Sequence, residues 1–244
     1  LAGQALVAPV WNQGLSIFDA SSLEQLYDAS NESRPLVKLD GTAVSGSIYY
    51  MPIEPQFSFT GEIGAFDLSD PANPQLIGRV DTGLELLDMM ALGNGTLYLL
   101  GDIEPRKLVI LDISVPNDPK LLSTLSLTEN GSRLTLVGNL LYITCEQSNC
   151  QTLTVVDVSD AERPSLLNQW QLPFDVSDAV AVGQQVYFTS SNNIVWAVDA
   201  SQPAQPKVIG SIDLPGWYGR LTAANNTLYV SACGAGLFVL TTTP

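Results

Sequence analysis

Aspartate recurs in this chain at a nearly constant spacing. The steps between successive copies are 48, 45, 45 and 42 residues, and the copies are Asp19, Asp67, Asp112, Asp157 and Asp199. Carboxylates that repeat in this way could form a ring of metal ligands, because hard cations such as Ca²⁺ take oxygen ligands. Each carboxylate could instead cap a turn by accepting a hydrogen bond from a backbone N–H about two residues further on. We favour the turn cap at every copy.

A second set of charged residues also repeats. Asp88, Arg133 and Asp178 are 45 residues apart and coincide when their strands are aligned on the turns, and Arg220 falls one place off that register. As a charged ring, these side chains could bind a polar ligand or an ion. Alternatively, they pair with one another as Asp–Arg–Asp across a narrow, water-filled channel. We favour this structural interpretation.

The segment 213–220, with the sequence DLPGWYGR, is another candidate site. Two aromatic residues, Trp217 and Tyr218, stand between glycines and beside Arg220. Aromatic and arginine side chains are enriched in contact surfaces, so this loop could stack on a sugar or grip a peptide. Packing of Trp217 over the edge of its own sheet is the alternative, and the sequence leaves both open. Trp170 and Trp196 lie within predicted strands, and we expect them in the core.

The sequence supports no catalytic site. The chain has no histidine, which excludes Ser-His-Asp and Cys-His arrangements. No glycine-rich loop follows a strand and opens a helix, so phosphate binding of that kind is unsupported. Paired carboxylates could still hydrolyse glycosides if two of them faced each other in a cleft. Calcium can bind Asp and backbone oxygens, but no D-x-D-x-D-G loop is present. We therefore assign no catalytic residue, no metal ligand and no cofactor.

The repeated Asp ends a strand that returns through the chain. Its clearest copy is residues 108–112, LVILD, followed by Ser114, Pro116 and Pro119. Related copies occur at residues 15–19, 63–67, 153–157, 194–199 and 237–241, the last with Thr241 in the Asp place. These apolar runs hardly alternate, which is expected of strands buried on both faces. The prolines fix φ and keep the connection from pairing as a strand.

Three further strands accompany each copy. A strand with a Tyr precedes it, as in residues 140–143, LLYI, and turn residues such as Gly93-Asn94-Gly95 stand before that type of strand. Asn-Gly between apolar runs indicates a hairpin, because these residues accept φ > 0. Another apolar run precedes the turn, and a fourth follows the prolines. Four strands in about 45 residues is the size of one propeller blade.

The unit resembles the LVIVD repeat, a bacterial and archaeal β-propeller repeat, in the strand 108–112 and in its Asp-x-Ser-x-Pro-x-x-Pro tail. The resemblance covers the whole chain, implies secreted or surface-attached propellers, and brings no catalytic residue. We expect an all-β fold: a β-propeller of six blades of four antiparallel strands, with the first and last blades incomplete. One propeller domain would span residues 1–244, with repeats near residues 4–30, 31–82, 83–128, 129–173, 174–215 and 216–244.

The strand count explains why the end blades are incomplete. The predicted strands number 22, with three in each end blade, whereas six blades of four strands need 24. In a ring the two absent strands are consecutive, so a segment upstream of Leu1 could supply both. We therefore expect a missing N-terminal segment of the same protein as one partner. The propeller would also place Asp88, Arg133 and Asp178 at the mouth of its central channel.

Charge and cysteines bear on partners and compartment. The net charge of −15 argues against nucleic-acid and anionic-membrane binding, which need basic surface. No run of about 20 apolar residues could cross a membrane, and a start at Leu1 without Met suits a processed secreted protein or a trimmed fragment. A disulfide between Cys145 and Cys150, favoured over two free thiols, would indicate an oxidising compartment. We expect Cys233 to be a buried free thiol, and the protein to be extracellular, cell-surface or periplasmic.

These observations favour a non-catalytic binding or scaffold propeller that contacts a protein or glycan through loops on one face. The expected contact residues are Asp88, Arg133, Asp178, Trp217, Tyr218 and Arg220. The competing hypothesis is a hydrolase or lyase that uses acidic residues at the channel mouth. Solvent-facing carboxylates with raised pKa would favour the enzyme, and an exposed aromatic patch would favour binding. A structural segment of a larger surface protein is a third interpretation.

Overall fold

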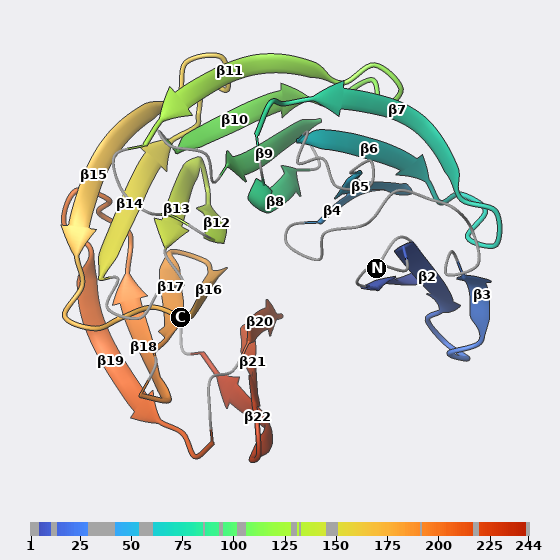
Figure 1. Ribbon diagram of the computed structural model, residues 1–244. Helices are drawn as coiled ribbons and strands as arrows, with labels where there is room; N and C mark the ends of the chain where they lie inside the picture. The colour runs from blue at the N-terminus through green and yellow to red at the C-terminus, as the bar shows by residue number, and fades with distance from the viewer. Residues whose placement is uncertain are drawn as a thin grey trace. The chain divides into compact units, whose positions relative to one another are not determined.

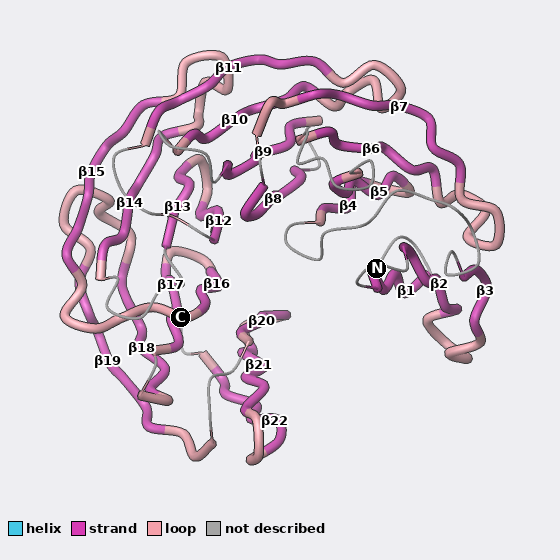
Figure 2. Tube along the Cα trace, viewed as in Figure 1, coloured by secondary structure: helices cyan, strands magenta, loops and turns pink. Residues whose placement is uncertain are grey.

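The regular structure of this chain is entirely β-strand in the part that the computed structural model describes. That part comprises residues 5–10, 14–28, 42–53, 61–84, 86–92, 95–101, 106–127, 131, 133–144, 151–190, 192–216 and 220–242. Its 22 strands form six antiparallel sheets, four with four strands and two with three (Figure 1). Figure 2 shows strands and connecting loops, and no helix among the described residues. The prediction of short antiparallel strands in groups of four is confirmed.

The chain divides into two compact units, and the first spans Leu1–Leu127. Its opening sheet has three strands: β1 (Ala5–Val10), β2 (Gly14–Asp19) and β3 (Gln25–Asp28). The next sheet has four: β4 (Ala43–Ser45), β5 (Ile48–Pro52), β6 (Glu62–Asp67) and β7 (Gln75–Asp81). The third also has four: β8 (Leu86–Leu92), β9 (Thr96–Gly101), β10 (Lys107–Asp112) and β11 (Lys120–Ser126).

The second unit spans Thr128–Pro244. Its first sheet contains β12 (Arg133–Val137), β13 (Leu140–Thr144), β14 (Thr152–Asp157) and β15 (Ser165–Gln171). Its second contains β16 (Asp178–Val182), β17 (Gln185–Thr189), β18 (Ile194–Asp199) and β19 (Lys207–Asp213). The last sheet has three strands: β20 (Leu221–Ala224), β21 (Thr227–Ala232) and β22 (Gly236–Thr241).

A shift in strand register recurs at one place and shows which strand each three-stranded sheet lacks. In the four-stranded sheets, the third and fourth strands slip register just before the repeated Asp, as between Ile110 and Leu111 of β10. The pair β2–β3 slips at the same place, between Ile17 and Phe18, so the opening sheet begins with its second strand. β22 holds Thr241 in the Asp position and follows β20 and β21, so it is a third strand. Among the described residues, the last sheet therefore has no fourth strand.

The third strand of each complete sheet is buried more deeply than the fourth strand beside it. In β10 the side chains of residues 108–111 are all between 0% and 1% exposed. Val109 and Leu111 pack toward the sheet β4–β7, against Ile63 and Ala65. Burying one such aliphatic side chain contributes roughly 1.5–3 kcal/mol. The prediction that these strands are buried on both faces is confirmed for β6, β10 and β14, whereas β18 is fully buried only at Val195 and Val198.

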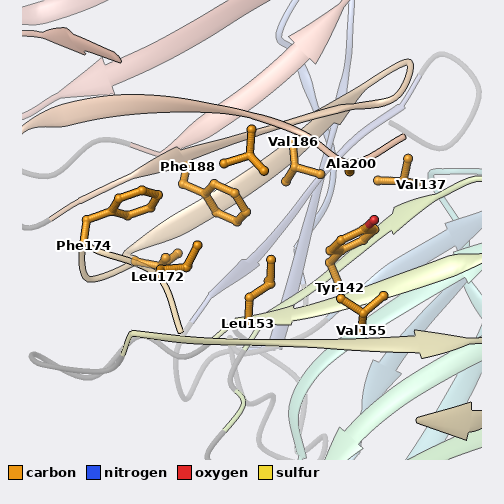
Figure 3. Packing of buried hydrophobic residues seen from close by; sticks show 11 residues of the cluster. Val137, Tyr142, Leu153, Val155, Leu172, Phe174, Val186, Phe188 and Ala200 are labelled. Carbon is orange, nitrogen blue, oxygen red and sulfur yellow. The ribbon is translucent and has the colours of Figure 1, made fainter. Parts of the chain in front are cut away.

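In the second unit, the sheets β12–β15 and β16–β19 share one hydrophobic cluster (Figure 3). Tyr142 and Val155 of the first sheet lie opposite Val186 of the second, with Phe174 and Phe188 at one end. Phe174 also stacks on Trp196, with ring centroids 4.3 Å apart and planes 7° apart. Trp170 packs against the same cluster. The prediction that Trp170 and Trp196 are packing residues is confirmed.

The proline-containing turn of one sheet covers the fourth strand of the sheet before it. A Cβ placed on Gly78 of β7 would lie 2.4 Å from the carbonyl oxygen of Pro116, in the turn that leads into β11. In the second unit, Asn168 of β15 donates its side-chain N–H to the carbonyl oxygen of Ala204, at 3.2 Å. Both contacts occur at the fourth residue of the strand, so this position lies against the turn of the following sheet.

We expect Gly78→Ala and Gly210→Ala to differ in their effect on stability, although both glycines hold the fourth place of a fourth strand. The methyl group at position 78 meets the Pro116 carbonyl, and forcing the two apart costs about 1–3 kcal/mol. A Cβ at position 210 has nothing within 4 Å, so its loss is within about 0.5 kcal/mol of zero. Urea unfolding of both variants measures the difference. Equal losses would contradict the packing described for the turn.

Candidate functional site

The repeated aspartates cap turns, as the sequence predicts. In each copy the carboxylate Oδ1 accepts a hydrogen bond from the backbone N–H of the serine two residues on. The N···O distances are 2.9 Å at Ser21, 2.8 Å at Ser69, 2.8 Å at Ser114, 2.8 Å at Ser159 and 2.9 Å at Ser201. These bonds favour the charged carboxylate.

The electrostatics of the caps agree with this role. Hydrogen bonds from Ser21 and Ser22 lower the pKa of Asp19 to about 2. Serine hydrogen bonds also lower the pKa of Asp112, Asp157 and Asp199 below the ordinary value of 3.8. No group of three or more metal-ligating side chains occurs in the described part of the chain. The repeated Asp therefore directs the chain out of its strand, and its oxygen is already engaged by the backbone.

Asp178 is the charged residue with the most unusual surroundings. It opens β16, is 9% exposed, and accepts two backbone hydrogen bonds. The N–H of Leu221, at the start of β20 in the next sheet, donates to Oδ2 at 2.8 Å. The N–H of Ala179 donates to Oδ1 at 3.0 Å. The carboxylate thus joins the first strands of two neighbouring sheets in the second unit.

Two arginines lie within electrostatic range of Asp178. Burial raises the pKa of the Asp178 carboxyl, while its two backbone hydrogen bonds and the positive charges of Arg220 and Arg133 lower it. Arg133 is half-buried at the start of β12, and Arg220 is exposed just before β20. The Arg220 backbone is held on both sides, because its N–H donates to the Ser231 hydroxyl and its carbonyl accepts from the Ser231 N–H. The structure therefore brings Arg133, Asp178 and Arg220 together.

The other predicted site residues are placed only in part. Asp88 lies in β8 of the first unit, and its side chain is outside the described residues. Trp217 and Tyr218 are also outside the described residues, as are Cys145 and Cys150. Cys233 is a free thiol, but the prediction that it is buried is wrong, because it is exposed. It follows the end of β21 in a short turn to β22 and does not lie within a strand facing the core.

A groove between β19 and β22 was not predicted from the sequence. Its volume is about 460 Å³. Its lining includes Ile209, Gly210 and Ile212 of β19, together with Val239 and Leu240 of β22. Two signals could have indicated it: Thr241 replaces the repeated Asp, and no fourth run of apolar residues follows it.

The architecture of successive four-stranded antiparallel sheets is that of β-propeller repeats, and sequence comparison identifies the repeat. The family model described as LVIVD repeat matches residues 63–82, 104–126 and 130–170. The resemblance to LVIVD repeats seen in the sequence is thereby confirmed over these residues. No curated protein matches the chain in sequence.

Solved structures resemble the chain in fold. The computationally designed protein Ika8 has a TM-score of 0.67 at 10% identity, covering 98% of this chain and 68% of its own. BamB from Moraxella catarrhalis has a TM-score of 0.62 at 15% identity, covering 97% of this chain and 79% of its own. A functionally unknown protein from Desulfotomaculum acetoxidans DSM 771 has a TM-score of 0.70 at 12% identity, covering 89% and 69%. At these identities the likeness concerns the fold alone.

We expect Asp178→Ala to destabilise the second unit by about 1–3 kcal/mol, because it leaves the buried N–H of Leu221 without its acceptor. Asp178→Asn should cost less, since the amide oxygen can still accept that hydrogen bond. The two variants should also differ from wild type in pH dependence. A raised pKa means that the folded protein binds this proton more readily, so wild type gains stability relative to Asp178→Asn as pH falls toward 3.8.

Asp112→Asn is the matched control, because the pKa of Asp112 is shifted in the direction opposite to that of Asp178. The Asp112 cap stabilises the fold above pH 3.8, and this contribution is lost as pH falls through the lowered pKa of the folded state. The stability difference between wild type and Asp112→Asn should therefore shrink in acid. Chemical unfolding from pH 7 to pH 3 measures both variants. The same pH trend in the two would refute the assigned role of Asp178.

Proposed function

We propose that this protein is a non-catalytic binding or scaffold propeller that works outside the cytoplasm. Its partner would be a protein or a glycan, contacted through loops on one face of the rigid sheets. The carboxylates best placed to do chemistry support this role, because each described candidate is engaged by the backbone. The five repeated aspartates accept serine N–H bonds, and Asp178 accepts two further backbone bonds. The proposal rests on this one observation: the described candidate carboxylates are already engaged in backbone hydrogen bonds.

The proposed contact surface lies at the start of the first strands. Arg133 and Arg220 would present guanidinium groups there, with Asp178 holding them in place. Guanidinium groups suit carboxylates, which they can bind through two parallel hydrogen bonds. Trp217 and Tyr218 adjoin Arg220 in sequence and would add stacking area, and Asp88 belongs to the same proposed set. A glycan or peptide that carries a carboxylate is the ligand class that this chemistry favours.

The competing proposal is a hydrolase or lyase, and Asp178 is the observation that favours it. Burial raises its pKa, as is common for catalytic acids. However, Asp178 is buried, its two oxygens accept backbone hydrogen bonds, and the charged neighbours described for it are arginines. General acid catalysis of glycoside hydrolysis needs a pair of carboxylates facing the substrate. The binding role is therefore the stronger proposal.

We further propose that the propeller has six four-stranded blades. The opening sheet lacks a first strand and the last sheet lacks a fourth among the described residues, so two more strands would complete both. A segment of the same protein outside residues 1–244 is the proposed source. A larger surface protein that contains this propeller as a structural segment is compatible with that source. No described helix is long and apolar enough to cross a membrane.

An extracellular or periplasmic setting predicts a disulfide between Cys145 and Cys150. Structural disulfides persist in oxidising compartments and are rare in the cytosol. Peptide mapping of protein purified from its native compartment, without reductant, should yield a linked peptide that contains both cysteines. Cys233 serves as the internal control, because its exposed thiol should react with a maleimide before reduction. Two alkylatable thiols at positions 145 and 150 would contradict the proposed setting.

The binding proposal is tested with an array of acidic and neutral glycans and peptides. We expect binding to carboxylate-bearing ligands that weakens about tenfold in Arg133→Gln and in Arg220→Gln, as expected when an interface arginine is lost. Arg163→Gln is the control, because Arg163 is exposed in a turn and pairs with Asp160 at 2.7 Å. It should bind like wild type. Retained binding in both test variants would refute the proposed surface, and turnover of a chromogenic glycoside would favour the enzyme.

A further inference from the structure

Among the described residues, no strand pairs with the outer edge of β22. In each four-stranded sheet, the third strand pairs with the second on one edge and with the fourth on the other. β22 takes the third place, yet within the described part of the chain it pairs with β21 alone. The free edge of a strand presents unpaired N–H and C=O groups, which can accept another strand. β22 is therefore open to strand addition.

The preceding sheet, β16–β19, is exposed at positions of its fourth strand that are covered in other complete sheets. Ile212, the sixth residue of β19, is 45% exposed, whereas Val80 and Trp170 at the sixth place of β7 and β15 are half-buried. Gly210, the fourth residue of β19, has nothing within 4 Å of an ideal Cβ. Its counterpart Gly78 is covered by the turn at Pro116. The turn and fourth strand of a following sheet are what covers these positions in the complete sheets.

The groove described above is the space that this missing cover leaves. Its volume is about 460 Å³, and it runs between Ile209–Ile212 of β19 and Val239–Thr242 on β22 and just after it. Residues 236–241, GLFVLT, contain neither a charge nor a proline. Natural edge strands usually carry such residues to prevent pairing, so this edge lacks the usual protection.

We propose that β22 and this groove form a strand-addition site for an extended segment that carries the pattern of this chain's own fourth strands. Those strands read QLIGRVD in β7, KLLSTLS in β11, SLLNQWQ in β15 and KVIGSID in β19. All four have Leu or Val second, Leu or Ile third, a small or polar residue fourth, and an apolar residue sixth. The occupant is such a seven-residue strand, preceded by a proline-containing turn.

A second copy of this chain does not fit as the occupant. Among its described residues, the four strands of this pattern are already paired in their own sheets, so none of these strands can be donated. The occupant comes instead from chain outside residues 1–244. This inference rests on the six-blade architecture proposed above, and it adds the sequence and the register of the strand that completes the last blade.

The recurring register shift fixes how the segment pairs. In the complete sheets, the first residue of the fourth strand lies opposite the repeated Asp. The second residue lies opposite the residue that precedes this Asp, and the fourth residue lies opposite the one that precedes the Asp by two. Transferred to β22, the first residue lies opposite Thr241, the second opposite Leu240 and the fourth opposite Val239. The turn that precedes the strand would then lie over Gly210, as Pro116 lies over Gly78.

The test adds a synthetic peptide to the 244-residue chain. The peptide has the sequence of residues 115–126, VPNDPKLLSTLS, which contains both the turn that covers Gly78 and the strand β11. We expect one peptide to bind per chain, and the backbone amides of β22 to become protected from hydrogen–deuterium exchange. A peptide of the same composition in scrambled order should leave those amides unprotected.

A substitution in the groove links binding to this site. Gly210→Arg places a long side chain where the turn of the peptide would lie, and the surrounding space lets the chain fold without a clash. We expect peptide affinity to fall about tenfold or more. Thr124→Arg is the control, because Thr124 is exposed at the fifth place of β11 in the other unit. It should bind the peptide like wild type.

Three results would overturn the proposal: no binding of the peptide, equal binding of the scrambled peptide, or unchanged affinity in Gly210→Arg. A chain that is dimeric through β22 and keeps its dimer in excess peptide would assign the edge to a second copy and would also overturn it. Binding to the array of glycans and peptides is measured separately, with Arg133→Gln and Arg220→Gln. Failure of the strand-addition site and failure of the proposed binding function are therefore distinguishable.

Discussion

Burial of the third strand on both faces is the constraint on which the rest of this structure depends. A sheet of this repeat has two apolar faces, so it is stable only with another sheet packed on each. Leu108 and Ile110 on one face of β10 are fully buried, and so are Val109 and Leu111 on the other. In β22 of the last sheet, apolar side chains are left exposed: Leu237 is 63% exposed and Val239 is 59% exposed. The repeats therefore stabilise one another through the faces that they bury.

The acidic composition of the chain follows partly from the same repeat. Each of the five turns between a third and a fourth strand is capped by an Asp carboxylate, and the hydrogen bonds of the cap favour its charged form. The caps lie at the surface, where water solvates their charge, and the pKa is lowered in four of them: Asp19, Asp112, Asp157 and Asp199. Asp178 is different, because burial raises its pKa while the backbone of β20 and two arginines oppose that shift. A raised pKa is commonly a sign of function, yet here the hydrogen bond to Leu221 gives the carboxylate a structural role.

The strands were predictable because their signals are local. Residues 108–112 form a strand with a buried interior, and Asp112 accepts a hydrogen bond from the Ser114 N–H. Gly95, in the turn of a predicted hairpin, has a φ of 84°. The contact between Asp178 and Leu221 was not predictable, because the backbone N–H of Leu221 has no sequence signature. The register shift at Ile110 and Leu111 was equally invisible, since it arises when the third and fourth strands pair. Cys233 was misjudged because a thiol next to a strand resembles a core residue, and only the turn at Gly234 exposes it.

The last sheet separates two hydrogen bonds that occur together elsewhere in the chain. The residue after the repeated Asp donates its N–H to a carbonyl of the preceding hairpin turn, as Ile113 does to Gly95 at 2.7 Å and Val158 to Asn139 at 2.9 Å. Thr242 makes the same bond to Asn226 at 2.9 Å, so the end of β22 is anchored in the usual way. Only the carboxylate cap is missing, because Thr241 takes its place. Asp occurs in the five sheets whose third strand is followed by a fourth, and Thr occurs where none follows among the described residues. The carboxylate therefore does not hold the third strand in place: its physical task is to turn the chain toward the fourth.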